Sequence, residues 1–231
     1  LIEPMEELNK TIGMYDVKNK IIKQIIYSLQ GLDKDKTMMH TVITGPPGVG
    51  KTMLGYIIGK IYYKMGLIKQ KKNAKFINPL NGKKENFKFT IARRSDLIGE
   101  YVGHTATKTQ KIIDESLGGI LFIDEAYSLG NEEKKDTYSK ECIDTLNQNL
   151  SENKDKIIVI IAGYEDSLEK CFFSYNVGLK RRFNFIYKID VYTYTELSEI
   201  FKKFINDIKW KLDKSIDKKD YIEFLLSNGL N

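Results

Sequence analysis

Residues 45–52 read Gly45-Pro46-Pro47-Gly48-Val49-Gly50-Lys51-Thr52 and match the pattern G-x-x-x-x-G-K-[ST] at every fixed position. A short β-rich stretch at 41–44 precedes them, and a segment with helical apolar spacing at 51–63 follows. In that context the glycines let successive backbone N–H groups point at phosphate oxygens, while the helix presents its positive end to the same anion. The stretch therefore predicts a phosphate-binding loop.

Two side chains of this loop have expected chemical roles. The Lys51 ammonium can reach the β- and γ-phosphate oxygens of a nucleotide, and the Thr52 hydroxyl can coordinate Mg²⁺. An accidental glycine-rich turn is the alternative interpretation, which the order of strand, loop and helix disfavours. We predict that the chain binds ATP with Mg²⁺. The cofactor-binding residues expected here are Gly45, Pro46, Pro47, Gly48, Val49, Gly50, Lys51, Thr52 and Met53.

An apolar strand at 119–123 ends in two carboxylates, Asp124 and Glu125. A carboxylate in the position of Asp124 can hold Mg²⁺ through its water shell. Glu125 points differently and can orient or deprotonate the water that attacks the phosphate. Two acids that merely cap a strand are the alternative, and it is weak after a phosphate-binding strand, loop and helix in this order. The stretch predicts a metal ligand and a catalytic residue.

Unbroken apolar strands alternate with helical segments along most of the chain. Strands without polar alternation are buried on both faces, which indicates a parallel sheet covered by helices. The strands are expected at 41–44, 87–92, 119–123, 157–162 and 185–189, and helices at 16–29, 51–63, 108–117 and 136–150. From Thr195 the pattern is helical only. We therefore predict an α/β nucleotide-binding domain at 1–192 and part of a helical lid at 193–231.

Composition excludes other classes of protein. The chain has 231 residues, of which 42% are hydrophobic and 29% charged, so it is not a disordered chain. Its apolar runs are shorter than the roughly 20 residues that span a bilayer, so we expect no membrane association. Cys142 and Cys171 lack metal-type spacing and favour reduced thiols in a cytosolic or nuclear protein. Because the chain begins at Leu1 rather than Met, we interpret it as a fragment.

The formal net charge of +6 keeps nucleic acid among the partners considered. Part of the excess lies at 69–88, where lysines are interrupted by asparagine, proline and glycine. We interpret such a stretch primarily as a solvated loop or hairpin, and only secondarily as an anion-binding patch. Nucleic acid is therefore the less favoured partner.

Further stretches resemble the AAA+ ATPases, and within them the CbbX/SpoVK-like branch. The resemblance covers nearly the whole chain. Besides the phosphate-binding loop, it is carried by 11–18 (TIGMYDVK), 95–106 (SDLIGEYVGHTA), 124–129 (DEAYSL), 161–164 (IAGY) and 176–183 (NVGLKRRF). The clusters at 141–147 and 170–176 are also similar to AAA+ proteins of large DNA viruses, which makes a viral homologue the expected relative.

The resemblance implies an oligomeric ring, commonly a hexamer, with the nucleotide at the interface between subunits. It places Ile12 and Gly13 beside the adenine and Tyr164 at the sensor-1 position, where many relatives have asparagine. It places Arg182 at the arginine-finger position, from which it reaches the neighbour's γ-phosphate. Arg181 replaces the usual serine, so either arginine remains a candidate catalytic residue. The sensor-2 arginine of the family would lie after Asn231.

The resemblance also places Tyr101, Val102 and Gly103 in the first pore loop of a ring. An aromatic and an aliphatic side chain can grip an extended client chain, and the glycine lets the loop bend. A buried tyrosine at a helix start is the alternative. His104 is expected to make a local hydrogen bond, because no other metal-binding residue type lies near it in the sequence.

Three functions remain after these steps. The leading hypothesis is an ATP-driven ring that remodels a protein client. The second is an ATPase that handles nucleic acid in replication or packaging. The third is a nucleotide-gated scaffold without useful turnover. The motifs do not identify the client, since one fold serves many functions.

Overall fold

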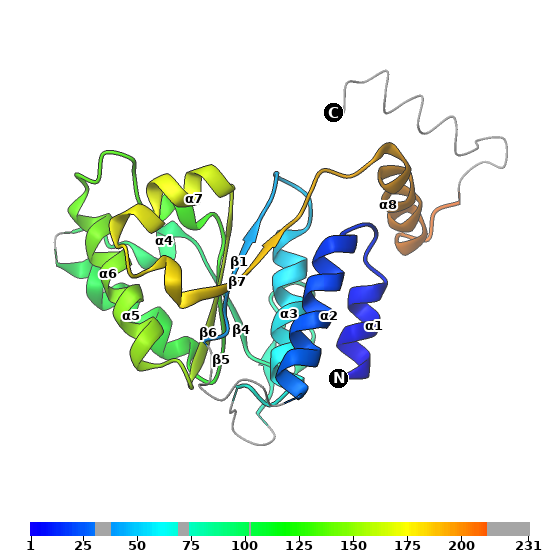
Figure 1. Ribbon diagram of the computed structural model, residues 1–231, viewed down its shortest axis with the longest axis horizontal. Coiled ribbons are helices and arrows are strands. Elements are labelled where there is room, and N and C mark those ends of the chain that lie inside the picture. The colour runs from blue at the N-terminus through cyan, green and yellow to red at the C-terminus, as the bar shows by residue number, and fades with distance from the viewer. Residues whose placement is uncertain (31–37, 69–73, 102, 212–231) are drawn as a thin grey trace.

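A computed structural model describes residues 1–30, 38–68, 74–101 and 103–211 (Figure 1). Its centre is a five-stranded sheet in the order β4-β5-β6-β1-β7, in which every neighbouring pair is parallel. The strands are β1 (His40–Thr44), β4 (Phe89–Ala92), β5 (Gly119–Ile123), β6 (Ile157–Gly163) and β7 (Phe183–Lys188). The predicted parallel sheet is confirmed. Only strand ends differ, with β4 beginning two residues later and β7 two residues earlier than the apolar pattern indicated.

Helices cover both faces of this sheet. The covering helices are α1 (Ile2–Asn9), α2 (Tyr15–Leu29), α3 (Lys51–Lys64), α4 (Arg94–Leu97), α5 (His104–Ser116), α6 (Thr137–Glu152) and α7 (Glu165–Cys171), and a further helix, α8 (Tyr194–Asp207), follows the last strand. Three short 3₁₀ helices are η1 (Ala126–Leu129), η2 (Phe173–Tyr175) and η3 (Lys180–Arg182). All helices predicted within the described residues are present. Sequence periodicity missed α1, α4 and α7, which have eight residues or fewer and so too few turns to show a pattern.

The strands are apolar throughout because each contributes to two cores. Ile120 and Phe122 of β5 face α1, α2 and α3, whereas Leu121 and Ile123 face the side of α4, α5, α6 and α7. Figure 1 shows these two groups of helices on opposite sides of the strands. A strand buried on both faces has no solvent side, so its sequence carries no polar alternation.

Helix α3 packs closely against the core because two of its residues, Gly55 and Gly59, lack a side chain. A Cβ atom at Gly55 would lie 2.5 Å from the Phe122 ring, and one at Gly59 would lie 2.7 Å from the Phe87 ring. Both distances are shorter than a carbon–carbon contact allows. This close packing fixes the helix whose first turn carries the phosphate-binding loop.

A buried polar network joins α2 and α3 to the sheet. The Gln24 amide donates to the Tyr62 hydroxyl at 2.9 Å, and the Tyr187 hydroxyl donates to the Gln24 carbonyl oxygen. Thr41 lies 3.1 Å from the same Tyr62 hydroxyl. Because these buried polar groups satisfy one another, they set one orientation of α2 on the sheet.

The lysine-rich stretch is a hairpin where the structure describes it. Strands β2 (Phe76–Ile77) and β3 (Lys84–Glu85) pair antiparallel, which agrees with the loop or hairpin expected there, while residues 69–73 lie outside the described ranges. Helix α8 begins with a capping box of Thr193 and Glu196. It lies beyond the end of the strands, near the connection between α1 and α2 (Figure 1). The division into two domains remains a prediction, and residues 212–231 lie outside the described part.

Candidate nucleotide-binding site

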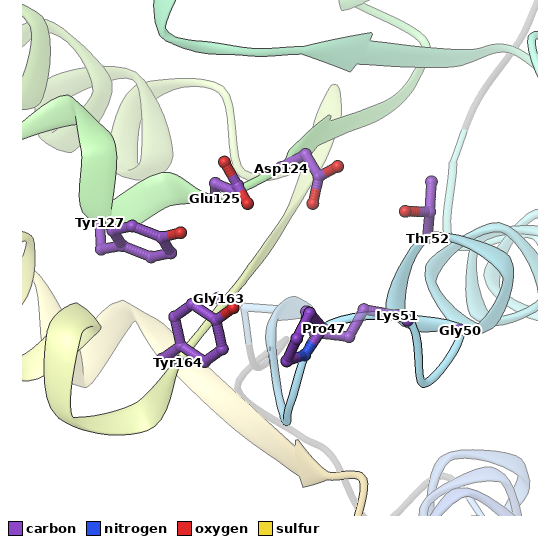
Figure 2. A pocket seen from close by; sticks show the side chains of 10 residues that line it. Pro47, Gly50, Lys51, Thr52, Asp124, Glu125, Tyr127, Gly163 and Tyr164 are labelled. Atoms are coloured by element: carbon purple, nitrogen blue, oxygen red, sulfur yellow. The ribbon is translucent and has the colours of Figure 1, made fainter. Parts of the chain in front are cut away.

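The carboxyl ends of β1, β5 and β6 bring three segments together around one cavity of about 320 Å³. Because these strands are parallel neighbours, the residues that follow them meet at the same edge of the sheet. The cavity is lined by Pro47, Gly48, Gly50, Lys51, Thr52, Asp124, Glu125, Tyr127, Gly163 and Tyr164 (Figure 2). Two motifs that lie more than 70 residues apart in the sequence thus form one site.

The phosphate-binding loop has the backbone that its glycines predict. Gly50 adopts a left-handed φ of +91° immediately before α3, and α3 has no side-chain cap at this end. Its first N–H groups are therefore available to an anion, together with the positive end of the helix dipole. At the start of the loop, a Cβ atom on Gly45 would lie 2.6 Å from the carbonyl oxygen of Ile189. A side chain at this position would push the loop away from the sheet.

The ammonium group of Lys51 lies inside the cavity. Its Nζ donates hydrogen bonds to the carbonyl oxygens of Gly45 at 2.8 Å and Pro46 at 2.6 Å, and it lies 5.4 Å from the centre of the Tyr164 ring. Burial lowers the pKa of Lys51, while the charges of Asp124 and Glu125 act in the opposite direction. The negative charge of a phosphate would act in the same direction as these two carboxylates and favour the ammonium form.

The two carboxylates leave β5 in different directions. The amide of Asp124 still pairs with the Ala92 carbonyl at 3.0 Å, so this residue continues the sheet, and its side chain is half-buried. Glu125 is exposed and turns the chain with a left-handed φ of +50°. Such a conformation in a residue other than glycine is strained and is often found at functional sites. The turn separates a carboxylate beside the loop from one that faces the open cavity.

Two tyrosines form the wall opposite the phosphate-binding loop. The rings of Tyr127 and Tyr164 lie 5.4 Å apart, and Figure 2 shows both on the side of the cavity across from Thr52. Burial, followed by the negative charge of Glu125, raises the pKa of Tyr127. The Tyr127 phenol is therefore a neutral hydrogen-bond donor at neutral pH, with no charge to repel a phosphate.

The residue types around the cavity fit a magnesium nucleotide. The Thr52 hydroxyl and the Asp124 carboxylate supply oxygen ligands, which Mg²⁺ prefers, and Lys51 with the first turn of α3 supplies phosphate contacts. This donor set corresponds to the predicted roles of these residues, which remain predictions.

The residues expected beside the adenine lie next to the loop but outside the cavity lining. A Cβ atom built on Gly50 would lie 3.5 Å from the Cε atoms of both Met14 and Met53. Gly13, which precedes Met14, is buried and Ile12 half-buried. This packing brings the segment that contains Ile12 and Gly13 to the rim of the loop. Their contact with a base remains a prediction.

The two arginines lie away from their own chain's cavity. Arg182 is half-buried, and its guanidinium donates to Ser151 Oγ at 2.7 Å and to the Gly178 carbonyl at 2.6 Å. Arg181 is exposed, and within the described residues it makes no hydrogen bond or ion pair. The two candidates therefore differ in exposure and in the hydrogen bonds that hold them, a difference that the sequence alone did not show.

The predicted pore loop lies at the surface. The Tyr101 side chain is 67% exposed and contacts His104 edge to face, with ring centres 5.7 Å apart. Gly103 has a left-handed φ of +82°, and Val102 lies outside the described residues. A groove of about 600 Å³ runs beside the tyrosine, lined by Gly99, Glu100, Tyr101, His104, Thr107, Lys108 and Lys111. The alternative of a buried tyrosine is wrong.

Sequence reasoning missed three residues around the site. Tyr127 and Gly163 line the cavity, and Tyr192 donates a hydrogen bond to the Val49 carbonyl in the loop at 2.8 Å. Tyr127 and Gly163 lie within stretches that were already singled out, 124–129 and 161–164, so their position was a usable signal. Tyr192 had none, because it is 143 residues from Val49 in the sequence.

Comparison with known proteins identifies the family. Residues 41–190 match the family described as "ATPase family associated with various cellular activities (AAA)". The chain belongs to the AAA family of ATPases. This AAA chain is accordingly a nucleotide-binding P-loop protein, and the match covers every strand of the parallel sheet except the first residue of β1.

Its relatives belong to the predicted branch of the AAA family. The chain is 46% identical over 216 residues to the cfxQ-like protein R730 of Acanthamoeba polyphaga mimivirus, covering 93% of this chain and 49% of that protein. It is 36% identical to stage V sporulation protein K of Bacillus subtilis, covering 96% of this chain and 66% of that protein. It is 32% identical to the chloroplastic cbbX homolog of Guillardia theta, with coverages of 93% and 56%. The CbbX/SpoVK-like assignment and the viral relative are confirmed.

This AAA chain spans about half to two thirds of the length of these relatives. In the part of the chain that the structure describes, none of the helices combines the length and apolar character needed to cross a membrane.

Proposed function

We propose that this AAA module binds ATP with Mg²⁺ at the described cavity and hydrolyses it within an oligomeric ring that remodels a protein client. The observation that carries the proposal is the convergence of Lys51, Thr52, Asp124 and Glu125 on one cavity. Each has the chemistry that γ-phosphoryl transfer requires, namely a cation, a hydroxyl ligand, a carboxylate ligand and a base.

In the proposed reaction different residues of the chain bind the phosphates, hold the metal and accept the proton. Lys51 and the N–H groups at the start of α3 bind the β- and γ-phosphates, and Thr52 with Asp124 would hold Mg²⁺, which neutralises phosphate charge. Glu125 accepts a proton from a water whose oxygen forms a bond to the γ-phosphorus. The bond between that phosphorus and the β–γ bridging oxygen breaks, and ADP and inorganic phosphate leave.

A neighbouring subunit would complete the site with an arginine. Within one chain neither Arg181 nor Arg182 lines the cavity, so neither can stabilise charge in its own site. Arg182 is our first candidate because it occupies the family position for this role. It would have to give up its bonds to Ser151 and Gly178, whereas Arg181 is exposed and has no hydrogen bond or ion pair to another residue of the described ranges. Arg181 is therefore the second candidate.

The Tyr101 loop would contact the client. An exposed aromatic ring beside a groove can pack against an extended chain without requiring a particular sequence. Nucleic acid remains the second candidate client because Lys75, Lys83 and Lys84 of the hairpin region are exposed. A scaffold without useful turnover is the third interpretation.

Lys51→Ala is expected to weaken binding of Mg-ATP by at least about 100-fold, because it removes the cation from a partly buried phosphate site. Titration of a fluorescent ATP analogue measures the affinity. Lys20→Ala, on the exposed side of α2, is the matched control and should bind as the unmodified protein does. Equal affinity in Lys51→Ala and Lys20→Ala would contradict the proposed site.

Tyr101→Ala is expected to leave basal ATP hydrolysis within about twofold while removing stimulation by an unfolded protein such as reduced casein, because the ring lies outside the nucleotide cavity. Tyr27→Ala, another exposed aromatic residue, is the control and should retain the stimulation. Stimulation by single-stranded DNA in place of casein would favour the nucleic-acid function. Ring assembly with negligible turnover would favour the scaffold.

A further inference from the structure

Arg94 joins three segments that are distant in the sequence. It is the first residue of α4, and its guanidinium donates one hydrogen bond to the Ser128 carbonyl and another, of 3.2 Å, to the Asp136 carboxylate. Ser128 belongs to η1, which directly follows Glu125, and Asp136 is the N-cap residue of α6. The Arg94 side chain is half-buried among them.

The bond to Ser128 acts on the backbone of the proposed catalytic base. The Ser128 amide donates to the Glu125 carbonyl at 2.8 Å and closes the turn that begins at Glu125. The left-handed φ of Glu125 is strained for a residue with a side chain and persists only where other contacts hold it. Arg94 supplies such a contact, because it holds the carbonyl of the residue that closes the turn.

Asp136 holds the guanidinium in this position. Its carboxylate accepts hydrogen bonds from Ser139 Oγ at 2.6 Å and from the Tyr138 amide at 3.0 Å. Burial acts to raise the pKa of Asp136, but hydrogen bonds from Ser139 and Arg94 outweigh it and keep the pKa below its usual value. Arg94 therefore faces a charged partner that is itself fixed to α6.

Arg94 also stands at the base of the loop that carries Tyr101. The carbonyl of Leu97 accepts from Thr109 Oγ1 at 2.9 Å, and that of Ile98 accepts from Lys108 Nζ at 3.0 Å. These bonds tie the end of α4 to α5. The loop that carries Tyr101 therefore begins at the end of the short helix that carries Arg94.

We propose that Arg94 is a positioning residue that holds Glu125 in its water-activating geometry. The inference rests on the proposed role of Glu125. It differs from that role because Arg94 touches neither the nucleotide cavity nor the reacting atoms.

A double-mutant cycle on ATP hydrolysis by the full-length protein tests this link. In Arg94→Ala we expect kcat to fall about 10- to 100-fold, the loss typical of a small misplacement of a catalytic group, with KM for Mg-ATP changed less than about twofold. Arg94→Lys keeps the cation and should recover part of the rate. In single-turnover measurements with labelled ATP, adding Arg94→Ala to Glu125→Gln should not lower the residual rate further.

Each outcome bears on one claim. Unchanged kcat in Arg94→Ala, or an additional loss in the Glu125→Gln background, would overturn the inference. So would a loss of both ATP affinity and melting temperature in Arg94→Ala that is just as large in Arg94→Lys. Such losses are signs of a purely structural role. If Arg94→Ala does not fold, Arg94→Lys replaces it in the same cycle. Arg93→Ala, at the exposed neighbouring position, should have unmodified kcat. Full turnover in Glu125→Gln would instead refute the proposed function.

Discussion

Arg182→Ala is expected to lower the rate of ATP hydrolysis by about 10³- to 10⁵-fold while leaving nucleotide affinity almost unchanged. The transition state spreads negative charge over γ-phosphate oxygens that Lys51 and Mg²⁺ cover only in part, and an arginine from the next subunit supplies the missing cation. Because Arg182 does not line the cavity of its own chain, its removal leaves that binding site intact.

Mixing Arg182→Ala with Lys51→Ala protein is the decisive measurement. Each variant is inactive alone, but a mixed ring can combine an intact phosphate-binding loop from one subunit with an intact arginine from its neighbour. Activity that returns on mixing and rises with total protein concentration supports action between subunits. Separate nucleotide titrations should show that Arg182→Ala still binds Mg-ATP.

A control is needed because Arg182 also has contacts within its own chain. Its bonds to Ser151 and Gly178 are worth about 1–3 kcal/mol each, so Arg182→Ala can lower stability as well as activity. Ser151→Ala removes one of these bonds and keeps the arginine, and it should retain hydrolysis. If mixed rings demonstrably form but stay inactive, the assignment to Arg182 fails and Arg181 is tested in the same way.

Glu125→Gln is expected to keep ATP bound while lowering the rate of hydrolysis by about 10²- to 10⁴-fold. The amide has nearly the same shape as the carboxylate but cannot accept the proton of the attacking water. Lys51, Thr52 and Asp124 remain in place, so phosphate and metal contacts are retained. A filter-binding assay for labelled ATP, combined with a phosphate-release assay, measures the two properties separately.

Glu133→Gln is the matched control for this variant, since Glu133 is an exposed carboxylate outside the cavity. It should bind and hydrolyse ATP normally. Undiminished turnover in Glu125→Gln would contradict the role of Glu125 as the base. A Glu125→Gln ring held with ATP would also retain its client longest, so proteins that co-purify with it are the most direct guide to that client.

The strands and the chemistry of the two principal motifs follow from short stretches of sequence. The phosphate-binding loop is contiguous, so the fixed spacing of its glycines, Lys51 and Thr52 is enough to predict their roles. Apolar runs indicated buried parallel strands because burial on both faces removes polar alternation. Asp124 and Glu125 were identifiable because they end such a run.

Which segments meet depends on the packing of the whole chain. The strand order puts β6 between β5 and β1, and so brings Gly163 and Tyr164 into the cavity beside Lys51. The apolar sequence of each strand indicates that the strand is buried. Which strand lies beside it in the sheet depends on how the helices and the sheet pack, and no short stretch of sequence specifies that.

The same reason explains the individual contacts that sequence reasoning missed. Tyr192 reaches the loop at Val49, Arg182 is bonded within its own chain, and Arg94 connects to Ser128 across 34 residues of sequence. An arginine or tyrosine has the same intrinsic chemistry at any exposed position, so the residue type does not predict which group it will bond. The folded chain decides the partner, because a hydrogen bond forms only between groups that packing has brought within about 3 Å.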